Sequence, residues 1–143
     1  MNTVKGIFSK KSDEWETPSD LFSTWDNLYH FTLDPCCTHE NAKCEKHYTI
    51  EEDGLHNSWE NEVVWCNPPY SKCYEWCLKA LYESMNRNAT VVMLLPSRTD
   101  TKWFHDVVQP FSEIRFIRGR LRFNNSNQNA PFASLIAIFR SRG

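Results

Sequence analysis

The apolar positions of the chain form short continuous runs that alternate with stretches of helical periodicity. The runs predict strands over residues 31–33, 62–66, 90–95, 113–117 and 133–139, and the periodic stretches predict helices over residues 17–28, 71–85 and 100–108. Continuous apolar runs are typical of strands that are buried on both faces, as in parallel sheets covered by helices. The pattern therefore predicts an α/β domain with a mostly parallel sheet between helices.

The first predicted helix has a recognisable start. Thr17 is suited to cap it, and Pro18 fits the first turn, where its missing N–H costs nothing. The apolar face of this helix comprises Leu21, Phe22 and Trp25, and that of the second helix comprises Tyr74, Cys77, Leu78 and Leu81. Both faces are expected to pack against the sheet.

Length and composition indicate one folded domain. The chain has 143 residues, of which 41% are hydrophobic and 24% charged, well outside the range of disordered chains. No apolar stretch is long enough to span a bilayer, and the N-terminus lacks the apolar core of a secretion signal. We therefore expect a flexible segment over residues 1–14, a domain over residues 15–140, no contact with a membrane, and a location in the cytoplasm.

The formal net charge of -2 conceals two halves of opposite sign. Residues 1–86 contain seven Lys/Arg and fifteen Asp/Glu, whereas residues 87–143 contain nine Lys/Arg, eight of them arginine, and three Asp/Glu. A basic half on an acidic protein fits a polyanionic partner, since arginine binds phosphate well. The alternative is that the basic half simply packs against the acidic half.

Six cysteines without a secretion signal indicate reduced thiols rather than disulfides. Several Cys and His residues are close in sequence, namely Cys36, Cys37, His39, Cys44 and His47. They lack the C-x-x-C pair of common zinc sites, and Cys73 and Cys77 have the spacing of an apolar helix stripe. We therefore expect no metal and no catalytic thiol.

Three predicted strands are followed by short segments that could form a site. These segments are Asp34-Pro35-Cys36, Asn67-Pro68-Pro69-Tyr70 and Pro96-Ser97-Arg98. In open α/β sheets, ligands bind beyond the carboxyl ends of the strands. The chain has only four glycines and no glycine-rich phosphate loop, which argues against nucleotide hydrolysis and against a nicotinamide site.

Asn67-Pro68-Pro69-Tyr70 has the chemistry to hold a planar amine. The two prolines restrict the backbone, so the Asn67 side-chain oxygen and the Pro68 carbonyl can form two fixed acceptors. Two acceptors suit an exocyclic NH₂ group, which has two donors, and Tyr70 offers a flat face on which a base can stack. The alternative is an ordinary proline turn, with Tyr70 packed in the core.

This motif and its surroundings resemble the small phage-type DNA adenine methyltransferases of the Dam family. The matching segments are Trp15–Pro18, Leu33–Cys36, Asn41–Lys43, His47–Thr49, Asp53–Leu55, Trp65–Tyr70, Leu95–Thr101, Gly119–Phe123 and Ala130–Phe132. They extend over about residues 15–139, nearly the whole chain. Asn-Pro-Pro-Tyr alone also occurs in methylases of RNA and of protein glutamine, so the combination is the more specific signal.

The resemblance implies an abbreviated Rossmann-like methyltransferase fold with S-adenosylmethionine as cofactor. It assigns the catalytic motif to Asn67, Pro68, Pro69 and Tyr70, and cofactor binding to Trp15, Thr17, Pro18, Asp34, Pro35, Cys36, Asp53, Gly54 and Leu55. No glycine turn follows Asp34, and only eighteen residues separate it from Asp53. The cofactor half is therefore shortened, and the candidates for the residue that binds the ribose are Glu51 and Glu52.

The function implied is direct methyl transfer to the amine of an adenine rotated out of DNA in a bacterial host cell. Four arginines are expected to contact DNA phosphates: Arg98, Arg118, Arg120 and Arg122. The loop over residues 124–129, rich in Asn and Gln, could read base edges or be a solvated connection. Two alternatives stay open: methylation of RNA or a protein amide, and a nucleic-acid-binding module that has lost its cofactor.

Overall fold

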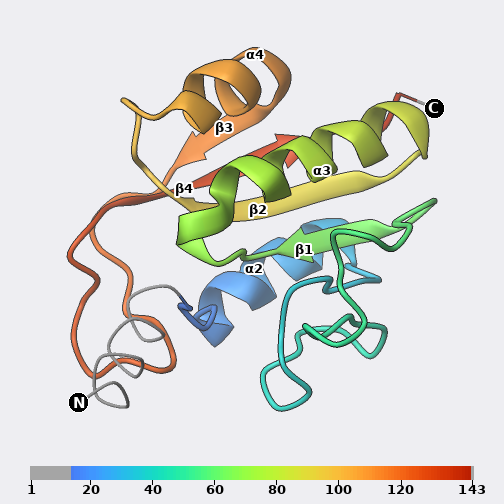
Figure 1. Ribbon diagram of the computed structural model, residues 1–143. Coiled ribbons are helices and arrows are strands. Elements are labelled where there is room, and N and C mark those ends of the chain that lie inside the picture. Colours follow the sequence, from blue (N-terminus) through green and yellow to red (C-terminus); the bar gives the residue numbers. More distant parts are fainter. Residues whose placement is uncertain (1–13, 143) are drawn as a thin grey trace, which may run out of the picture.

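A four-stranded sheet forms the centre of the computed structural model, which describes residues 14–142 (Figure 1). The strands are β1 (Val63–Cys66), β2 (Thr90–Pro96), β3 (Glu113–Phe116) and β4 (Ser134–Phe139), in the order β1-β2-β4-β3. Four of the five predicted strands are thus confirmed to within one residue at each end. In β1, β2 and β4 nearly every position is buried, including all six of β4, whereas β3 has no buried position and pairs with β4 on one side.

The prediction of a mostly parallel sheet is wrong. Only β1 and β2 run parallel, whereas β4 is antiparallel to both of its neighbours. The reversal arises because β3 and β4 pair directly with each other, and the connection over residues 117–133 returns the chain between them. Burial of β4 on both faces makes its pattern identical to that of a parallel strand, so periodicity could not reveal its direction.

The strand predicted over residues 31–33 is reduced to isolated bridges. Leu33 pairs with Val64 and Asp34 pairs with His47, both in parallel orientation. Beyond β1, the sheet therefore continues only through the single-residue bridges at Leu33 and Asp34. Pro35 follows at once and cannot donate a ladder hydrogen bond, which explains why pairing stops there.

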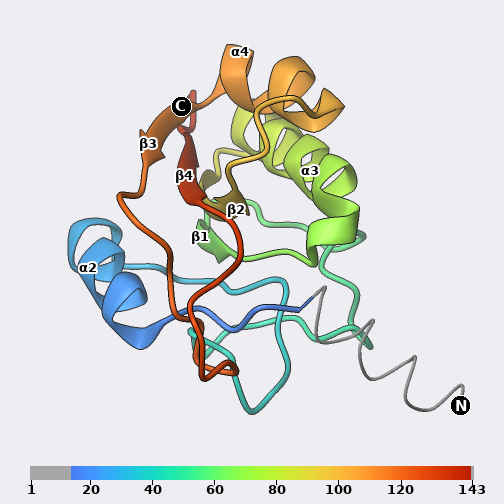
Figure 2. The same cartoon turned by 90° about the vertical axis from the view of Figure 1, so that its left-hand side faces the viewer.

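Helices cover both faces of the sheet, as expected (Figure 2). Helix α3 (Cys73–Asn86) and the π-helical turn η2 (Phe104–Val108), which continues into α4 (Gln109–Phe111), pack on one face. Helix α2 (Ser19–Tyr29) and the connection over residues 117–133 pack on the other. A single 3-10 turn, η1 (Tyr70–Lys72), leads into α3. This arrangement buries two apolar clusters, one on each side.

Two details of the helices differ from the prediction. Helix α2 begins at Ser19 without a side-chain cap, so Thr17 does not cap it. Leu78, assigned to the apolar face of α3, is 45% exposed, while Trp76 lies in the core as expected, with its ring stacked on that of Trp59 at 6.2 Å. Among residues 14–142, no helix combines the length and the apolar character needed to cross a membrane. The expected flexible segment over residues 1–14 lies outside the described residues, except for Glu14.

Candidate active site

The candidate site lies at one edge of the sheet, where three connections emerge together. Asn67 follows the last residue of β1, and Ser97 follows the last residue of β2. Pro96 pairs with Ser134 at the start of β4, and Phe116 at the end of β3 pairs with Leu135. The segment after β1, the segment after β2 and the connection over residues 117–133 therefore share this edge.

The side-chain amide of Asn67 is held in one orientation. Its Nδ2 atom donates to the backbone carbonyl of Trp15 and to Thr17 Oγ1, the latter at 3.1 Å. The Trp15 carbonyl can only accept, so the nitrogen must face it and the oxygen must face away. The Oδ1 atom is buried and has no hydrogen-bond partner among the described residues. A buried acceptor without a partner is costly, and one at a strand end marks a place where a donor can bind.

Thr17 belongs to this site rather than to the start of a helix. Its side chain is buried, and its hydroxyl oxygen accepts from the indole Nε1 of Trp65 at 3.2 Å as well as from Asn67. Trp65 lies in β1, two residues before Asn67. The hydroxyl therefore links the strand, the motif and the segment before α2.

Tyr70 packs in the core, as the alternative interpretation of the motif expects. Its ring is 9% exposed and meets the ring of Phe132 nearly edge-on, with centroids 5.5 Å apart. Burial raises the pKa of its hydroxyl, which has no hydrogen-bond partner among the described residues. Pro69 precedes it in an extended conformation, and Pro68 is buried. Phe132 is a neighbour that the sequence did not identify as a site residue.

Asp34 carries a buried carboxylate beside the end of β1. Its Oδ2 accepts from the N–H of Lys43 at 2.9 Å, and its Oδ1 accepts from the N–H of Cys36 at 3.3 Å. Burial raises the pKa of Asp34 to about 6, although these backbone hydrogen bonds act in the opposite direction. Cys36 and Asp34 also lie near enough to Cys66 to influence its thiol electrostatically. The Asp34 segment is therefore adjacent to the strand that ends at Asn67.

The turn at Asp53 and Gly54 packs directly on the Asp34 segment. A Cβ atom at Gly54 would lie 2.0 Å from the carbonyl oxygen of Pro35, so only glycine permits this approach. Asp53 has a left-handed backbone with φ of 63°, and its carboxylate accepts from the N–H of Leu55 at 3.2 Å. The structure thus brings together two segments predicted to bind the cofactor.

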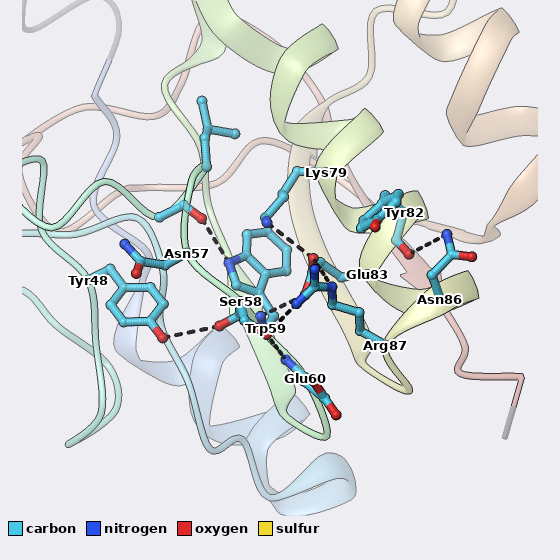
Figure 3. Close-up of polar contacts among 12 residues, drawn as sticks. Tyr48, Asn57, Ser58, Trp59, Glu60, Lys79, Tyr82, Glu83, Asn86 and Arg87 are labelled. Carbon is cyan, nitrogen blue, oxygen red and sulfur yellow. Dashed lines mark hydrogen bonds and ion pairs between the residues drawn. The ribbon is translucent and has the colours of Figure 1, made fainter.

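A buried carboxylate that the sequence did not identify braces this turn (Figure 3). Glu83 accepts from the backbone N–H of Trp59 at 2.6 Å and forms an ion pair with Lys79 at 3.1 Å. The indole N–H of Trp59 donates to the carbonyl of Gly54 at 2.9 Å. Glu83 therefore connects α3, which follows the Asn-Pro-Pro-Tyr motif, to the Gly54 turn. The spacing Lys79, Glu83, Arg87 was the available signal, since residues four apart share a helix face.

The four arginines predicted to contact DNA are exposed: Arg98, Arg118, Arg120 and Arg122. None of them forms an ion pair with a carboxylate among residues 14–142. Other arginines of the basic half do, for example Arg140, which pairs with Glu113 at 2.7 Å. Arg98 lies near enough to Tyr70 to favour its ionised form. The predicted set is therefore available to a partner and lies in connections that emerge at the edge of Asn67.

The Asn-rich loop holds the segment before α2. Asn125 contacts the backbone of Glu14 and Glu16, and Asn124 Nδ2 donates to the hydroxyl of Ser19 at 3.0 Å. The sequence left open whether this loop reads bases or is merely solvated. Two of its six polar side chains, those of Asn124 and Asn125, bind residues 14–19, so the loop is more than a solvated connection. Figure 2 shows the connection passing beside the segment that leads into α2.

The cysteine thiols supply no nucleophile, and the cavities lie away from Asn67. All six cysteines are free, and burial raises the pKa of the thiols of Cys37, Cys44, Cys66 and Cys77, in Cys44 to about 12. Such thiols are poor nucleophiles at neutral pH. An open cavity of about 550 Å³ is lined by Asp26, Phe31, Thr32 and residues 43–46, and a smaller one lies between α2 and β3. Neither cavity includes Asn67 or Tyr70.

Comparison with known proteins identifies a family that the chain matches. Residues 6–140 match the model of a family described as DNA N-6-adenine-methyltransferase (Dam). A DNA N-6-adenine-methyltransferase of Haemophilus phage HP1 is 37% identical over 123 residues, which cover 82% of this chain and 71% of that protein. Another protein of the same name, from Escherichia phage T1, is 37% identical over 111 residues, covering 76% of this chain and 46% of that protein.

Proposed function

The chain belongs to the Dam family of DNA N-6-adenine-methyltransferases. We propose that it methylates the exocyclic amine of adenine in DNA and that Asn67 holds this amine. S-adenosylmethionine is its methyl donor. The observation that carries the proposal is the fixed amide of Asn67, whose nitrogen is bound by Trp15 and Thr17 while its buried oxygen has no partner among residues 14–142.

The two acceptors of the motif explain how the amine becomes reactive. The amine of adenine has two N–H donors, and we assign one to Asn67 Oδ1 and the other to the Pro68 carbonyl. Hydrogen bonds to both protons increase electron density on the nitrogen and stabilise the positive charge that develops as it is methylated. Because the Asn67 amide is already oriented, no reorganisation is needed during the reaction. No protein nucleophile is required, which agrees with the raised pKa of the buried thiols.

The residues around Asp34 fit a cationic cofactor. S-adenosylmethionine supplies a methyl group on a positively charged sulfur, together with an ammonium group. The buried carboxylate of Asp34 has few compensating charges, since its hydrogen bonds come from backbone N–H groups. A nearby cation would stabilise its ionised form. We assign cofactor binding to Trp15, Thr17 and Pro18 and to the segments Asp34–Cys36 and Asp53–Leu55.

Base stacking on Tyr70 requires a local movement. The ring of Tyr70 is covered and contacts Phe132, which belongs to the connection over residues 117–133. We propose that the target base is rotated out of the duplex and displaces this ring contact when it stacks on Tyr70. The same connection carries Arg118, Arg120 and Arg122, so phosphate contacts and base entry would involve one segment.

The fold fits an abbreviated Rossmann-like methyltransferase domain. The parallel pair β1 and β2 places two strand-following segments at the site, and the sheet continues beyond β1 only through bridges at Leu33 and Asp34. This shortened edge corresponds to the short spacing between Asp34 and Asp53. Because both phage relatives carry the enzyme name, we also propose that the chain acts on DNA in the cytoplasm of a bacterial host.

Identification of the methylated product tests the proposed function. The full chain is incubated with cofactor labelled in its methyl group and, in separate reactions, with duplex DNA, RNA or unrelated protein. Nucleosides released from the DNA are then separated and identified by mass spectrometry. The proposal predicts labelled N6-methyladenine from DNA alone. Label in RNA or in a glutamine side chain, with none in DNA, would show that the substrate class is wrong.

A further inference from the structure

One peptide unit joins the Asn67 amide to the Asn-rich loop. The carbonyl of Trp15 accepts a hydrogen bond from Asn67 Nδ2, and the N–H of Glu16, at the other end of the same unit, donates to Asn125 Oδ1 at 3.1 Å. A peptide unit is planar, so its C=O and N–H turn together. Whatever fixes the Glu16 N–H therefore also fixes the direction of the Trp15 carbonyl.

Asn125 also holds the other side of Trp15. Its Nδ2 donates to the carbonyl of Glu14 at 2.9 Å, so its single amide spans the backbone from Glu14 to Glu16. The backbone N–H of Asn124 donates to the Glu16 carbonyl at 3.0 Å and continues the contact by one unit. The sequence separation between Asn125 and Glu16 is 109 residues, so this is a tertiary contact that local propensity does not produce.

Packing of the Trp15 ring does not replace these hydrogen bonds. The ring lies 5.2 Å from that of Phe123 and 5.3 Å from that of Phe132, measured between centroids. These contacts fix the position of the indole, but rotation of the following peptide unit about its flanking bonds leaves the indole in place. The orientation of the carbonyl that binds Asn67 is therefore set by polar contacts at the ends of that unit.

We propose that Asn125 is a positioning residue for Asn67. It holds the peptide unit after Trp15 so that the Trp15 carbonyl binds the Asn67 nitrogen and leaves the Asn67 oxygen free. The consequence for methyl transfer rests on the proposed function. Asn125 lies in the connection that carries Arg118, Arg120 and Arg122, so contact of that connection with DNA would be transmitted to the reactive amide.

The expected effect of removing Asn125 is moderate. Its hydrogen bonds are exposed to solvent, and such bonds contribute little individually. The ring packing of Trp15 remains, so Asn125→Ala should stay folded. We expect kcat to fall about tenfold, with KM for DNA and the dissociation constant for S-adenosylmethionine within about twofold of the original chain. Asn127→Ala is the matched control, since Asn127 is exposed in the same loop and makes no hydrogen bond to a described residue.

The test has a spectroscopic readout and a kinetic one. The side-chain NH₂ resonances of Asn67 are assigned in ¹⁵N-labelled full-length chain by comparison with Asn67→Ala. In Asn125→Ala these resonances should shift and exchange faster with solvent, whereas in Asn127→Ala they should stay in place. Unmoved resonances in Asn125→Ala, or an unchanged kcat, would overturn the proposal. If the original chain methylates no DNA, the proposed function fails, and the NH₂ resonances still decide whether Asn125 positions Asn67.

Discussion

Replacing Thr17 by Val removes one hydroxyl while preserving the shape of the side chain. The structure predicts two consequences, because Thr17 Oγ1 accepts from Trp65 Nε1 and from Asn67 Nδ2. The buried indole N–H loses its acceptor, which costs about 1–3 kcal/mol. For a chain of this length, each kcal/mol lowers Tm by about 3 °C, so we expect a decrease of about 3–9 °C.

The second consequence concerns catalysis. Asn67 keeps its bond to the Trp15 carbonyl but loses one of its two constraints, so kcat should fall about five- to tenfold. Calorimetry and steady-state methylation of DNA measure the two effects on the same preparation. The control is Thr24→Val, which removes an exposed hydroxyl bonded only to the Asp20 carbonyl of its own helix. That change should stay within about 0.5 kcal/mol and leave kcat unaltered.

The outcome distinguishes two roles of Thr17. A role in the site requires that both Tm and kcat fall in Thr17→Val and stay unchanged in Thr24→Val. A fall in Tm with unchanged kcat would show that the hydroxyl serves only Trp65. If neither quantity changes, the hydrogen bonds of Thr17 do not exist in solution, and the reasoning about a fixed Asn67 amide is refuted.

Two further predictions concern the charged residues. Because burial raises the pKa of Asp34 to about 6 from its ordinary 3.8, its ionisation destabilises the folded chain as pH rises through this window, by on the order of 3 kcal/mol above pH 6. The free energy of unfolding in urea should therefore fall between pH 4 and pH 7 in the original chain, and Asp34→Asn should lack this fall. Calorimetric titration should show weaker binding of S-adenosylmethionine to Asp34→Asn, and tighter binding would contradict the assignment. Arg120→Ala and Arg122→Ala should each weaken DNA binding at all sequences and reduce the slope of log affinity against log salt by about one, with Arg115→Ala, which removes a local pair with Glu113, as control. If the salt slopes of Arg120→Ala and Arg122→Ala equal that of the Arg115→Ala control, phosphate contacts by Arg120 and Arg122 are excluded.

Some of the fold and site could be predicted from local patterns. The runs over residues 62–66 and 90–95 became β1 and β2 because almost every position in them is buried between two helical layers. The prolines after Asn67 restrict the backbone wherever they occur, so the motif could be recognised without a structure. The direction of β4 could not be predicted, since a fully buried strand has the same apolar pattern in either orientation.

The remaining errors involve contacts between distant segments. Thr17 has the sequence of a helix cap, but its hydroxyl is used by Trp65 and Asn67, which lie 48 and 50 residues away. Phe132 and Asn125 lie in segments that the sequence singled out, but their roles depend on which segments the fold places beside them. Glu83 showed only a helical spacing of charges, and its burial against Trp59 is a tertiary effect.

The rate of methyl transfer by Asn67→Ala tests the central claim most directly. This change removes the buried oxygen that we assign to the adenine amine and leaves Pro68 and Pro69 in place. Single-turnover transfer to DNA is measured with saturating cofactor, cofactor affinity is measured separately, and Asn86→Ala, at the far end of α3, is the control. The account predicts a fall of at least about a hundredfold in Asn67→Ala with cofactor affinity and the control little changed. A rate in Asn67→Ala close to that of the original chain would contradict it.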